Sequence, residues 1–287
     1  MHLKQIVNQE TLKKMFDYYQ ENIIKINNPN LFFQARQDGI IINAYKTGTV
    51  TYDGEYLEDE ALMWGEIIED KYLYLDNQIG SDEVGTGDYF GPIVVVASYL
   101  KKEQVEELIT LGIKDSKKLN DSKILELALL LIKKVKYSLL TCEPKKYNEM
   151  VSKGLNMNSI KAKLHYRALN NLYAKYPNVP IIIDEFVNEK AFYNYLDKSE
   201  ITFQNINFHQ KGESIAPSIA VSSIIARFHF LNKIKEMENK YKLPFPLGAN
   251  MVVDVAAQLF AKQYSFNELN QVAKVSFANT KRLSILF

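Results

Sequence analysis

The chain has 287 residues, of which 47% are hydrophobic and 24% are charged, and its formal net charge is +1. This balance is typical of a folded protein with one large or two ordinary domains, and it excludes an intrinsically disordered chain. The sequence has no apolar run of about 18 residues and no signal-peptide-like start, and its single Cys142 cannot form an internal disulfide. We therefore expect a reducing cytoplasm as the compartment and no membrane partner.

The charge is unevenly distributed along the chain. Residues 1–70 contain 6 Lys/Arg and 12 Asp/Glu, a net charge of −6, whereas residues 71–287 contain 29 and 22, a net charge of +7. A basic larger part fits a polyanionic partner such as a nucleic acid, but it is equally compatible with an ordinary solvated surface.

The first 70 residues predict a small α+β module. Apolar side chains recur at helical spacing from Leu12 to Ile23, and Asn27–Asn30 interrupts that pattern. Short runs rich in β-formers then alternate with Gly-containing turns, and a helical pattern ends the module. The expected strands and helix are Leu31–Ala35, Ile40–Tyr45, Thr49–Tyr52 and Leu57–Ile68. The acidic stretch Glu66–Asp70 is either a domain boundary or a charged helix end.

Residues 71–287 predict an α/β domain, because strand patterns come first and then alternate with helical patterns. The expected strands are Tyr72–Leu75, Ile79–Asp82, Pro92–Leu100, Val135–Cys142, Pro180–Asp184 and Thr202–Phe208. The expected helices are Glu103–Leu111, Ser122–Ile132, Ser159–Tyr176, Ile215–Tyr241, Val252–Tyr264 and Phe266–Val272. No internal repeat or low-complexity tract interrupts this order.

Two adjacent acids, Asp82 and Glu83, end an apolar strand and precede Gly85 and Gly87. A phosphate-cradling glycine fingerprint opens directly into a helix, whereas here a β-branched run follows after Pro92. The glycines therefore favour tight turns and close approach of a ligand over a dinucleotide site. We expect no organic cofactor, and we expect the two acids to lie at the mouth of a hairpin.

Two further acids occupy positions where the sites of α/β proteins gather. Asp184 ends the apolar strand Ile181–Ile183, and Glu213 precedes the long helix with Pro217 near its start. Carboxylates that converge there repel one another unless a cation neutralises them, and hard oxygen ligands suit Mg²⁺ or Mn²⁺. Two such ions could support phosphoryl transfer.

Six motifs, in order, resemble those of ribonuclease HIII, a branch of the type 2 ribonucleases H. They are SDEVGTGDYFGP (Ser81–Pro92), GIKDSKKL (Gly112–Leu119), GLNMNSIKAKLH (Gly154–His165), IIIDEF (Ile181–Phe186), KGESIAPSIAVSSIIARF (Lys211–Phe228) and SFANTKR (Ser276–Arg282). The N-terminal module is similar to the small TATA-binding-protein-like domain of that family. The resemblance therefore covers nearly the whole chain.

The resemblance implies a ribonuclease H-like mixed sheet flanked by helices in residues 71–287, and a substrate-binding domain in residues 1–70. It implies endonucleolytic cleavage of the RNA strand of an RNA–DNA hybrid by a monomer that uses two Mg²⁺ or Mn²⁺ ions and leaves 3′-hydroxyl and 5′-phosphate ends. The acids that match the family are Asp82, Glu83, Asp184 and Glu213, the last at a place where type 2 relatives often have Asp.

The same resemblance suggests substrate contacts. The run Gly85-Thr86-Gly87 stands where ribonuclease HII has Gly-Arg-Gly, which favours the HIII branch, and its backbone is the expected contact to the 2′-hydroxyl. Lys117 and Lys118 are candidates for phosphate contact, although a solvated loop explains them without the resemblance. Lys161 and His165 share a helix face and are interpreted as support near the site rather than as catalysts.

Two other functions stay open from the sequence. A hybrid-binding protein without catalysis is disfavoured by the presence of all four carboxylates. An enzyme of the HII kind that incises at single ribonucleotides in duplex DNA is disfavoured by Thr86 and by the N-terminal extension.

Overall fold

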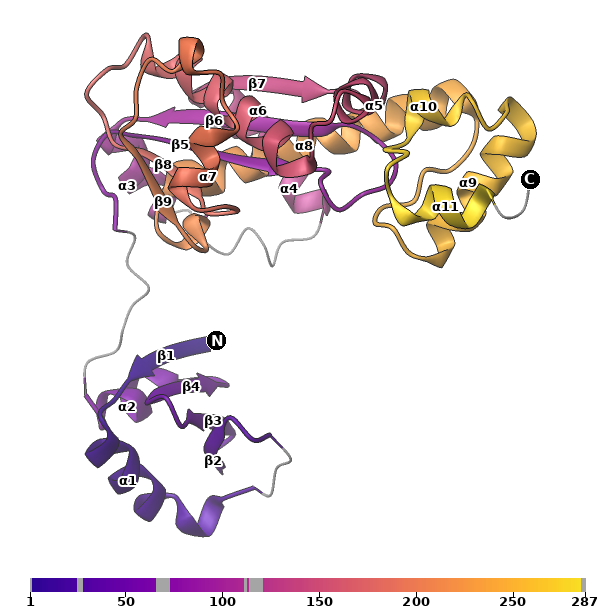
Figure 1. Cartoon of the computed structure of the whole chain (residues 1–287). Coiled ribbons are helices and arrows are strands. Elements are labelled where there is room, and N and C mark those ends of the chain that lie inside the picture. The colour runs from indigo at the N-terminus through magenta and orange to yellow at the C-terminus, as the bar shows by residue number, and fades with distance from the viewer. Residues whose placement is uncertain (1, 25–27, 66–72, 111–112, 114–120, 285–287) are drawn as a thin grey trace. The chain divides into compact units, whose positions relative to one another are not determined.

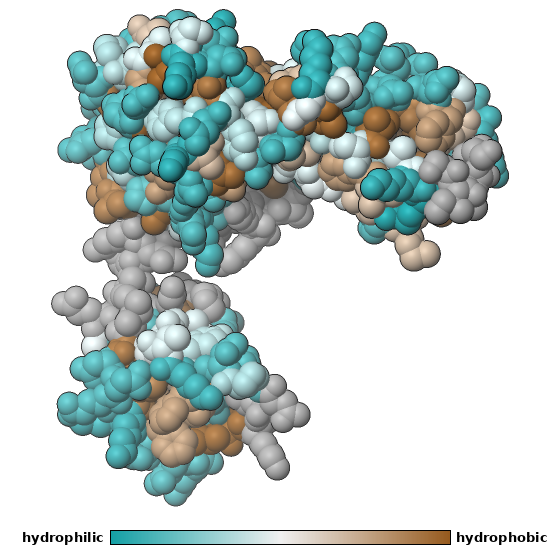
Figure 2. Space-filling view, viewed as in Figure 1, coloured by the Kyte–Doolittle hydropathy of each residue, from teal (hydrophilic) through white to brown (hydrophobic). Residues whose placement is uncertain are grey.

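The computed structural model describes residues 2–24, 28–65, 73–110, 113 and 121–284, and the chain divides into two compact units, Met1–Lys71 and Tyr72–Phe287 (Figure 1). The acidic stretch Glu66–Asp70, considered above as a boundary, lies outside the described residues. Hydrophilic residues cover much of the visible surface of each unit, and apolar residues appear there as smaller patches (Figure 2).

The smaller unit is an antiparallel four-stranded sheet, in the order β1-β4-β3-β2, with its own apolar core. Alternate strand residues such as Ile42, Val50 and Tyr52 are fully buried, as period-2 alternation requires of a sheet with one covered face. Its elements are β1 (His2–Ile6), α1 (Gln9–Tyr18), a 3-10 turn η1 (Gln20–Asn22), β2 (Leu31–Gln37), β3 (Ile40–Tyr45), β4 (Thr49–Asp53) and α2 (Leu57–Leu62).

Two features of this unit differ from the sequence prediction. Strand β1 was not predicted, and its residue Gln5 is polar although buried: it donates to the Ala61 carbonyl and accepts from the Tyr52 hydroxyl. The first helix ends at Tyr18 rather than near Ile23, and a 3-10 turn continues the apolar spacing that suggested a longer helix.

The larger unit contains a mixed five-stranded sheet in the order β7-β6-β5-β8-β9. Strands β7, β6 and β5 pair antiparallel, whereas β8 and β9 run parallel to β5. The strands are β5 (Gln78–Val84), β6 (Ile93–Leu100), β7 (Lys136–Cys142), β8 (Ile181–Asp184) and β9 (Ile206–His209). The predicted mixed sheet flanked by helices is therefore confirmed.

Helices cover the sheet and extend beyond it. The helices are α3 (Lys102–Thr110), α4 (Asp121–Lys134), α5 (Pro144–Ser152), α6 (Met157–Tyr173), α7 (Glu189–Asn194), α8 (Pro217–Tyr241), α9 (Met251–Tyr264), α10 (Leu269–Val272) and α11 (Ala278–Ser284), with 3-10 turns η3 (Lys198–Glu200) and η4 (Gly212–Ser214). Figure 1 shows α9, α10 and α11 gathered at one end of this unit, away from β8 and β9.

Side chains of the central strands alternate between two cores. Val94 and Val96 of β6 belong to the core that includes α8, whereas Val95 and Ala97 belong to the core that includes α6. Every residue of β6 is buried, which agrees with the continuous apolar run that predicted a strand covered on both faces. Residues of β5 therefore also face α8 and α6 in turn.

Helix α8 lies very close to β5, because both use small residues where they meet. A Cβ atom added to Gly80 would stand 2.3 Å from the Ser218 hydroxyl oxygen, so only glycine fits there. The Ser222 hydroxyl donates to the Gly80 carbonyl at 2.9 Å and to the Ser98 hydroxyl at 2.9 Å. Close packing on β5 thus explains the small side chains of Ser218 and Ser222 in this helix.

Several predicted boundaries in the larger unit were wrong. Residues 73–75 are not a strand, the strand expected at Thr202–Phe208 forms only from Ile206, and the last predicted helix begins at Leu269 rather than Phe266. Helices α5 and α7 were missed, because each is short and has only one or two fully buried residues. Such short amphipathic segments give little periodicity to detect.

A buried lysine joins the β5–β6 connection to the C-terminal helices. Lys274 has no exposed surface, its ammonium donates to the Gly91 carbonyl at 2.5 Å, and its backbone N–H donates to the Tyr89 carbonyl at 2.8 Å. Burial lowers the pKa of Lys274 to about 7, although the charge of Asp88 acts in the opposite direction.

This lysine should make stability depend on pH. Above about pH 7 the folded chain releases a proton that the unfolded chain keeps, so the free energy of unfolding should rise by up to about 1.4 kcal/mol per pH unit. Lys274→Met should remove that rise. Urea unfolding of the wild type and of Lys274→Met measures how the free energy of unfolding changes with pH in each protein. The range is about pH 7 to about pH 8.5, because an exposed thiol such as that of unfolded Cys142 titrates above it. Equal slopes would contradict the lowered pKa.

Candidate active site

The paired acids of the first motif lie on opposite faces of β5. Ser81 and Glu83 face α6, where Ser81 and Glu83 both contact His165, whereas Asp82 faces α8 and receives a hydrogen bond from Ser223. Adjacent strand residues always point to opposite faces, so one motif supplies carboxylates to both sides of the sheet end.

Asp184 ends β8, the parallel neighbour of β5. The register pairs Ser81 with Ile183, so Asp82 and Asp184 follow at the same level and on the same face. The Gly212 N–H donates to Asp184 Oδ1 at 2.8 Å. A Cβ atom on Gly212 would stand 3.2 Å from the Asp184 Cα, so this glycine lets the two backbones approach.

Glu213 is brought to the same corner of the unit by its backbone. It lies in the turn η4, directly after the glycine that binds Asp184 and four residues before α8 begins. Lys211 enters the turn with a left-handed φ of 56°. The Glu213 side chain is half-buried, and its role as a metal ligand stays a prediction.

The carboxyl group of Asp82 is in an unfavourable electrostatic position. Burial raises its pKa above the usual range, and the negative charges of Glu83 and Asp184 raise it further. Hydrogen bonds from Ser223 and from the Glu83 N–H act against this shift. The charges of Glu83 and Asp184 therefore add to burial in disfavouring the ionised form of Asp82.

Glu83 is instead held in its charged form. Burial would raise its pKa, but the hydrogen bond and charge of His165 and the charge of Lys161 outweigh burial and keep the pKa well below the usual range. Lys161 Nζ lies 2.5 Å from Oε1, and His165 Nε2 lies 2.9 Å from Oε2. Both candidates that sequence analysis placed near the site therefore contact a carboxylate of the first motif.

The Gly85–Gly87 turn follows β5 directly. Gly85 has a φ of +97°, and a Cβ atom there would stand 2.1 Å from the Pro92 carbonyl oxygen, so glycine is required. Gly87 is exposed and a Cβ atom would meet nothing within 4 Å, which leaves its backbone open to a ligand. Thr86 between them is half-buried. Lys117 and Lys118, the candidate phosphate contacts, lie outside the described residues.

Sequence reasoning missed three residues that contact the site. Ser81 binds His165 Nδ1 at 2.7 Å, Ser223 binds Asp82, and the ring centroid of Phe186 lies 3.9 Å from Lys161 Nζ. The spacing of Ser81 and Glu83, two residues apart on a strand, is a signal that they share a face. No comparable pattern points to Ser223 or Phe186, because their contacts join distant segments.

The donor set suits a hard divalent cation. The candidate ligands are all carboxylates, and the repulsion at Asp82 is what a cation would relieve. Within residues 2–24, 28–65, 73–110, 113 and 121–284, no three His, Cys, Asp or Glu side chains are already grouped closely enough to hold an ion together.

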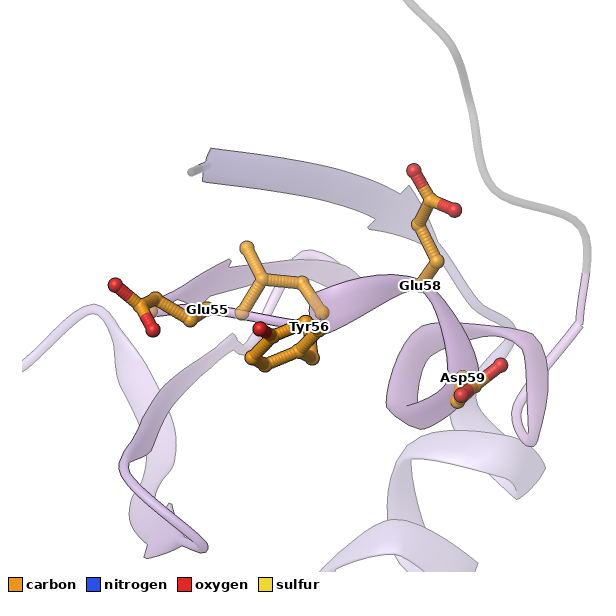
Figure 3. A pocket seen from close by; sticks show the side chains of 6 residues that line it. Glu55, Tyr56, Glu58 and Asp59 are labelled. Atoms are coloured by element: carbon orange, nitrogen blue, oxygen red, sulfur yellow. The ribbon is translucent and has the colours of Figure 1, made fainter.

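A separate hollow of about 460 Å³ lies in the smaller unit, lined by Gly54–Asp59. Figure 3 shows that the carboxylates of Glu55, Glu58 and Asp59 point away from one another rather than toward a common centre. This hollow therefore lacks convergent ligands, and its acidic rim disfavours phosphate.

Comparison with known protein families agrees with this fold. A family model described as Ribonuclease HII matches residues 79–280, and a domain of unknown function, DUF3378, matches residues 5–72. Together with the mixed sheet and its acidic strand ends, the first match defines a type 2 ribonuclease H, a metal-dependent endoribonuclease that acts on RNA–DNA hybrids.

Relatives that match over nearly the whole chain show which branch of the type 2 ribonucleases H this chain belongs to. The ribonuclease HIII of Phytoplasma mali (strain AT) is 41% identical over 271 residues, 93% of each chain, and that of Bacillus anthracis is 36% identical over 296 residues, 96% of this chain and 95% of the relative. The chain belongs to the ribonuclease HIII family.

Solved structures of ribonuclease HIII proteins have the same fold as this chain. Bst-RNase HIII, crystallised in complex with Mn²⁺, has a TM-score of 0.73 at 32% identity and 99% coverage of both chains. Aquifex aeolicus RNase H3, at 22% identity and a TM-score of 0.58 over 96% of this chain and 99% of that one, shares the fold.

In the described part of this chain, no helix is long and apolar enough to cross a membrane.

Proposed function

We propose that this enzyme hydrolyses the RNA strand of RNA–DNA hybrids with the help of two Mg²⁺ or Mn²⁺ ions, as a monomer, and leaves 3′-hydroxyl and 5′-phosphate ends. The observation that supports the proposal is that Asp82 and Asp184 lie side by side on one face at the ends of β5 and β8, with Glu83 next to Asp82 in the chain. Membership of the ribonuclease HIII family and the Mn²⁺ complex of Bst-RNase HIII support it.

The four acids Asp82, Glu83, Asp184 and Glu213 would hold the ions. When bound, such ions activate water and stabilise the leaving oxygen of a phosphodiester. The chain itself orients the ligands, because Ser223 binds the Asp82 carboxyl and the Gly212 N–H binds Asp184. These contacts orient Asp82 and Asp184 on the face of the sheet that packs on α8, whereas Glu83 faces α6 and contacts Lys161 and His165.

The Gly85–Gly87 turn is the proposed contact to the RNA strand. Backbone groups near Gly87 are accessible, and the wide, shallow minor groove of a hybrid exposes the 2′-hydroxyl that distinguishes RNA from DNA. In this role the glycine turn recognises the sugar without reading the base, so cleavage should show little sequence preference.

The purified enzyme should cut a hybrid with several consecutive ribonucleotides and cut a DNA duplex containing a single ribonucleotide far more slowly. The reason is the Gly-Thr-Gly turn, which sets the chain apart from enzymes of the HII kind. End-labelled versions of both substrates, incubated with Mg²⁺ or Mn²⁺, measure the two rates. Comparable rates would assign HII-like specificity, and binding without cleavage of either substrate would favour a non-catalytic hybrid-binding protein.

The smaller unit is proposed to bind the hybrid. The face of its sheet opposite the core carries a row of polar side chains in which Gln34 donates to Asn43 and Asn43 donates to Thr51. Because residues 1–70 have a net charge of −6, attraction to phosphate cannot come from the net charge of this unit. Polar contacts and shape on this face are therefore the proposed source of binding.

Removal of residues 1–70 should raise the Michaelis constant for a hybrid more than it lowers turnover at saturating substrate. The candidate ligands and both cores of the larger unit lie beyond the truncation, so the chemistry should survive. Circular dichroism checks that the shortened chain folds, and steady-state kinetics measures both constants. An unchanged Michaelis constant would exclude the substrate-binding role.

A further inference from the structure

Lys161 is a buried cation in direct contact with one of the proposed metal ligands. Its side chain is 10% exposed, that of Glu83 is 12% exposed, and their charged atoms are 2.5 Å apart. The other Glu83 oxygen contacts His165, which is 1% exposed and is itself bound to Ser81 through Nδ1. Both oxygens of this carboxylate therefore have partners within the protein.

The ring of Phe186 contacts both basic residues of this cluster. The ring centroid of Phe186 lies 3.9 Å from Lys161 Nζ and 5.5 Å from the His165 ring. Phe186 follows Asp184 by two residues, so the same segment carries a proposed metal ligand and the aromatic ring that covers the lysine. A cation over an aromatic face and beside a carboxylate is favoured where it is, although it has little contact with water.

The contrast with Lys163 on the same helix shows what is particular to Lys161. Lys163 also contacts a carboxylate, Asp197, at 2.8 Å, but that acid is 67% exposed and is not one of the proposed metal ligands. An exposed pair is screened by solvent, whereas a buried pair keeps its interaction and cannot easily exchange partners.

We propose that Lys161 is an internal counter-ion of Glu83, a positioning residue that holds this carboxylate in place in the metal-free enzyme and competes with a divalent cation for it. This inference rests on the proposed role of Glu83 as a metal ligand. Lys161 thus stabilises the empty site and raises the metal concentration that the enzyme requires.

The consequence for metal binding has a definite sign. A divalent ion near Asp82 and Glu83 is repelled by the lysine charge and must share Glu83 with it, so removal of the charge should favour the ion. The same removal leaves Glu83 buried with only one of its two partners, His165, so the metal-free protein should lose stability. A merely structural lysine would produce the second effect without the first.

Thermal unfolding at increasing MnCl₂ or MgCl₂ concentration, starting from chelated protein, tests the proposal. The variants are Lys161→Met, the control Lys163→Met, Glu83→Gln and the double variant Lys161→Met/Glu83→Gln. Lys161→Met should unfold at a lower temperature without metal, gain more from Mn²⁺ than the wild type, and reach half of its gain at a concentration at least about fivefold lower. Lys163→Met should match the wild type in its response to metal.

The double variant keeps the test informative if Lys161→Met does not fold. Removing both charges leaves no unpaired ion, so the double variant should be more stable than Glu83→Gln alone and should respond at a lower Mn²⁺ concentration than that single variant. A response of Lys161→Met at the wild-type concentration or above it would overturn the counter-ion role, and so would equal responses of the double variant and Glu83→Gln. If Glu83→Gln itself responds like the wild type, the proposed function of Glu83 fails instead.

Discussion

Asp184→Asn is expected to abolish cleavage while hybrid binding stays within a few-fold of the wild type. The substitution removes a negative charge from the end of β8, beside Asp82, where the structure concentrates carboxyl groups. The asparagine oxygen can still accept the hydrogen bond from the Gly212 N–H, so the local fold should persist. Loss of activity would then reflect loss of a cation ligand rather than unfolding.

Three measurements distinguish loss of a metal ligand from unfolding and from loss of hybrid binding. Circular dichroism reports folding, electrophoretic mobility of a labelled hybrid in the presence of chelator reports binding, and product formation with Mg²⁺ or Mn²⁺ reports chemistry. Asp197→Asn is the matched control, because it neutralises an acid that is 67% exposed and pairs only with a surface lysine among the contacts described for it. Substantial cleavage by a folded Asp184→Asn variant would contradict Asp184 as a ligand.

Glu213→Gln is expected to lower turnover by orders of magnitude and to raise the metal concentration that cleavage requires. Glu213 follows the glycine that binds Asp184, so its backbone stands at the same corner as the other acids. The competing explanation is a charge near the start of α8 that interacts with the helix dipole. In that case its loss should cost about 0.3–1 kcal/mol of stability and leave turnover nearly intact.

The variant Glu213→Asp tests whether the negative charge at this position is what the enzyme requires. Aspartate keeps the charge, and related enzymes often have it at this place, so the variant should retain part of the activity. Cleavage rates measured against Mg²⁺ and Mn²⁺ concentration, for the wild type and both variants, decide between the two explanations. A Gln variant with wild-type curves would remove Glu213 from the site.

Local patterns predicted most of the elements that build the site. The apolar run at Pro92–Leu100 indicated a strand covered on both faces, and β6 is buried throughout. The long helix predicted from Ile215 begins at Pro217, where a proline fits the first turn. Patterns failed where burial is polar or elements are short, as in β1 with its buried Gln5 and in α5 and α7.

The candidate acids were found from their positions next to strand and helix ends, and the motif order indicated the family. Those features are local: each depends on a few consecutive residues and on the rule that side chains at strand ends are accessible. The contacts of Lys161 and His165 could not be predicted from such local features. Their helical spacing shows a common face, but the partner of that face, Glu83, is about eighty residues earlier in the chain.

By itself, the sequence determined the family, the mixed α/β class of the larger unit and the four acids to test. Only the tertiary structure decided that Asp82 shares a face with Asp184 while Glu83 faces Lys161, His165 and Phe186. The physical reason is that strand register and helix packing set which distant side chains meet, and these depend on the whole core. The charge state of a carboxylate depends in turn on those neighbours. Burial and nearby negative charges raise the pKa of Asp82, whereas His165 and Lys161 lower the pKa of Glu83 although it is buried.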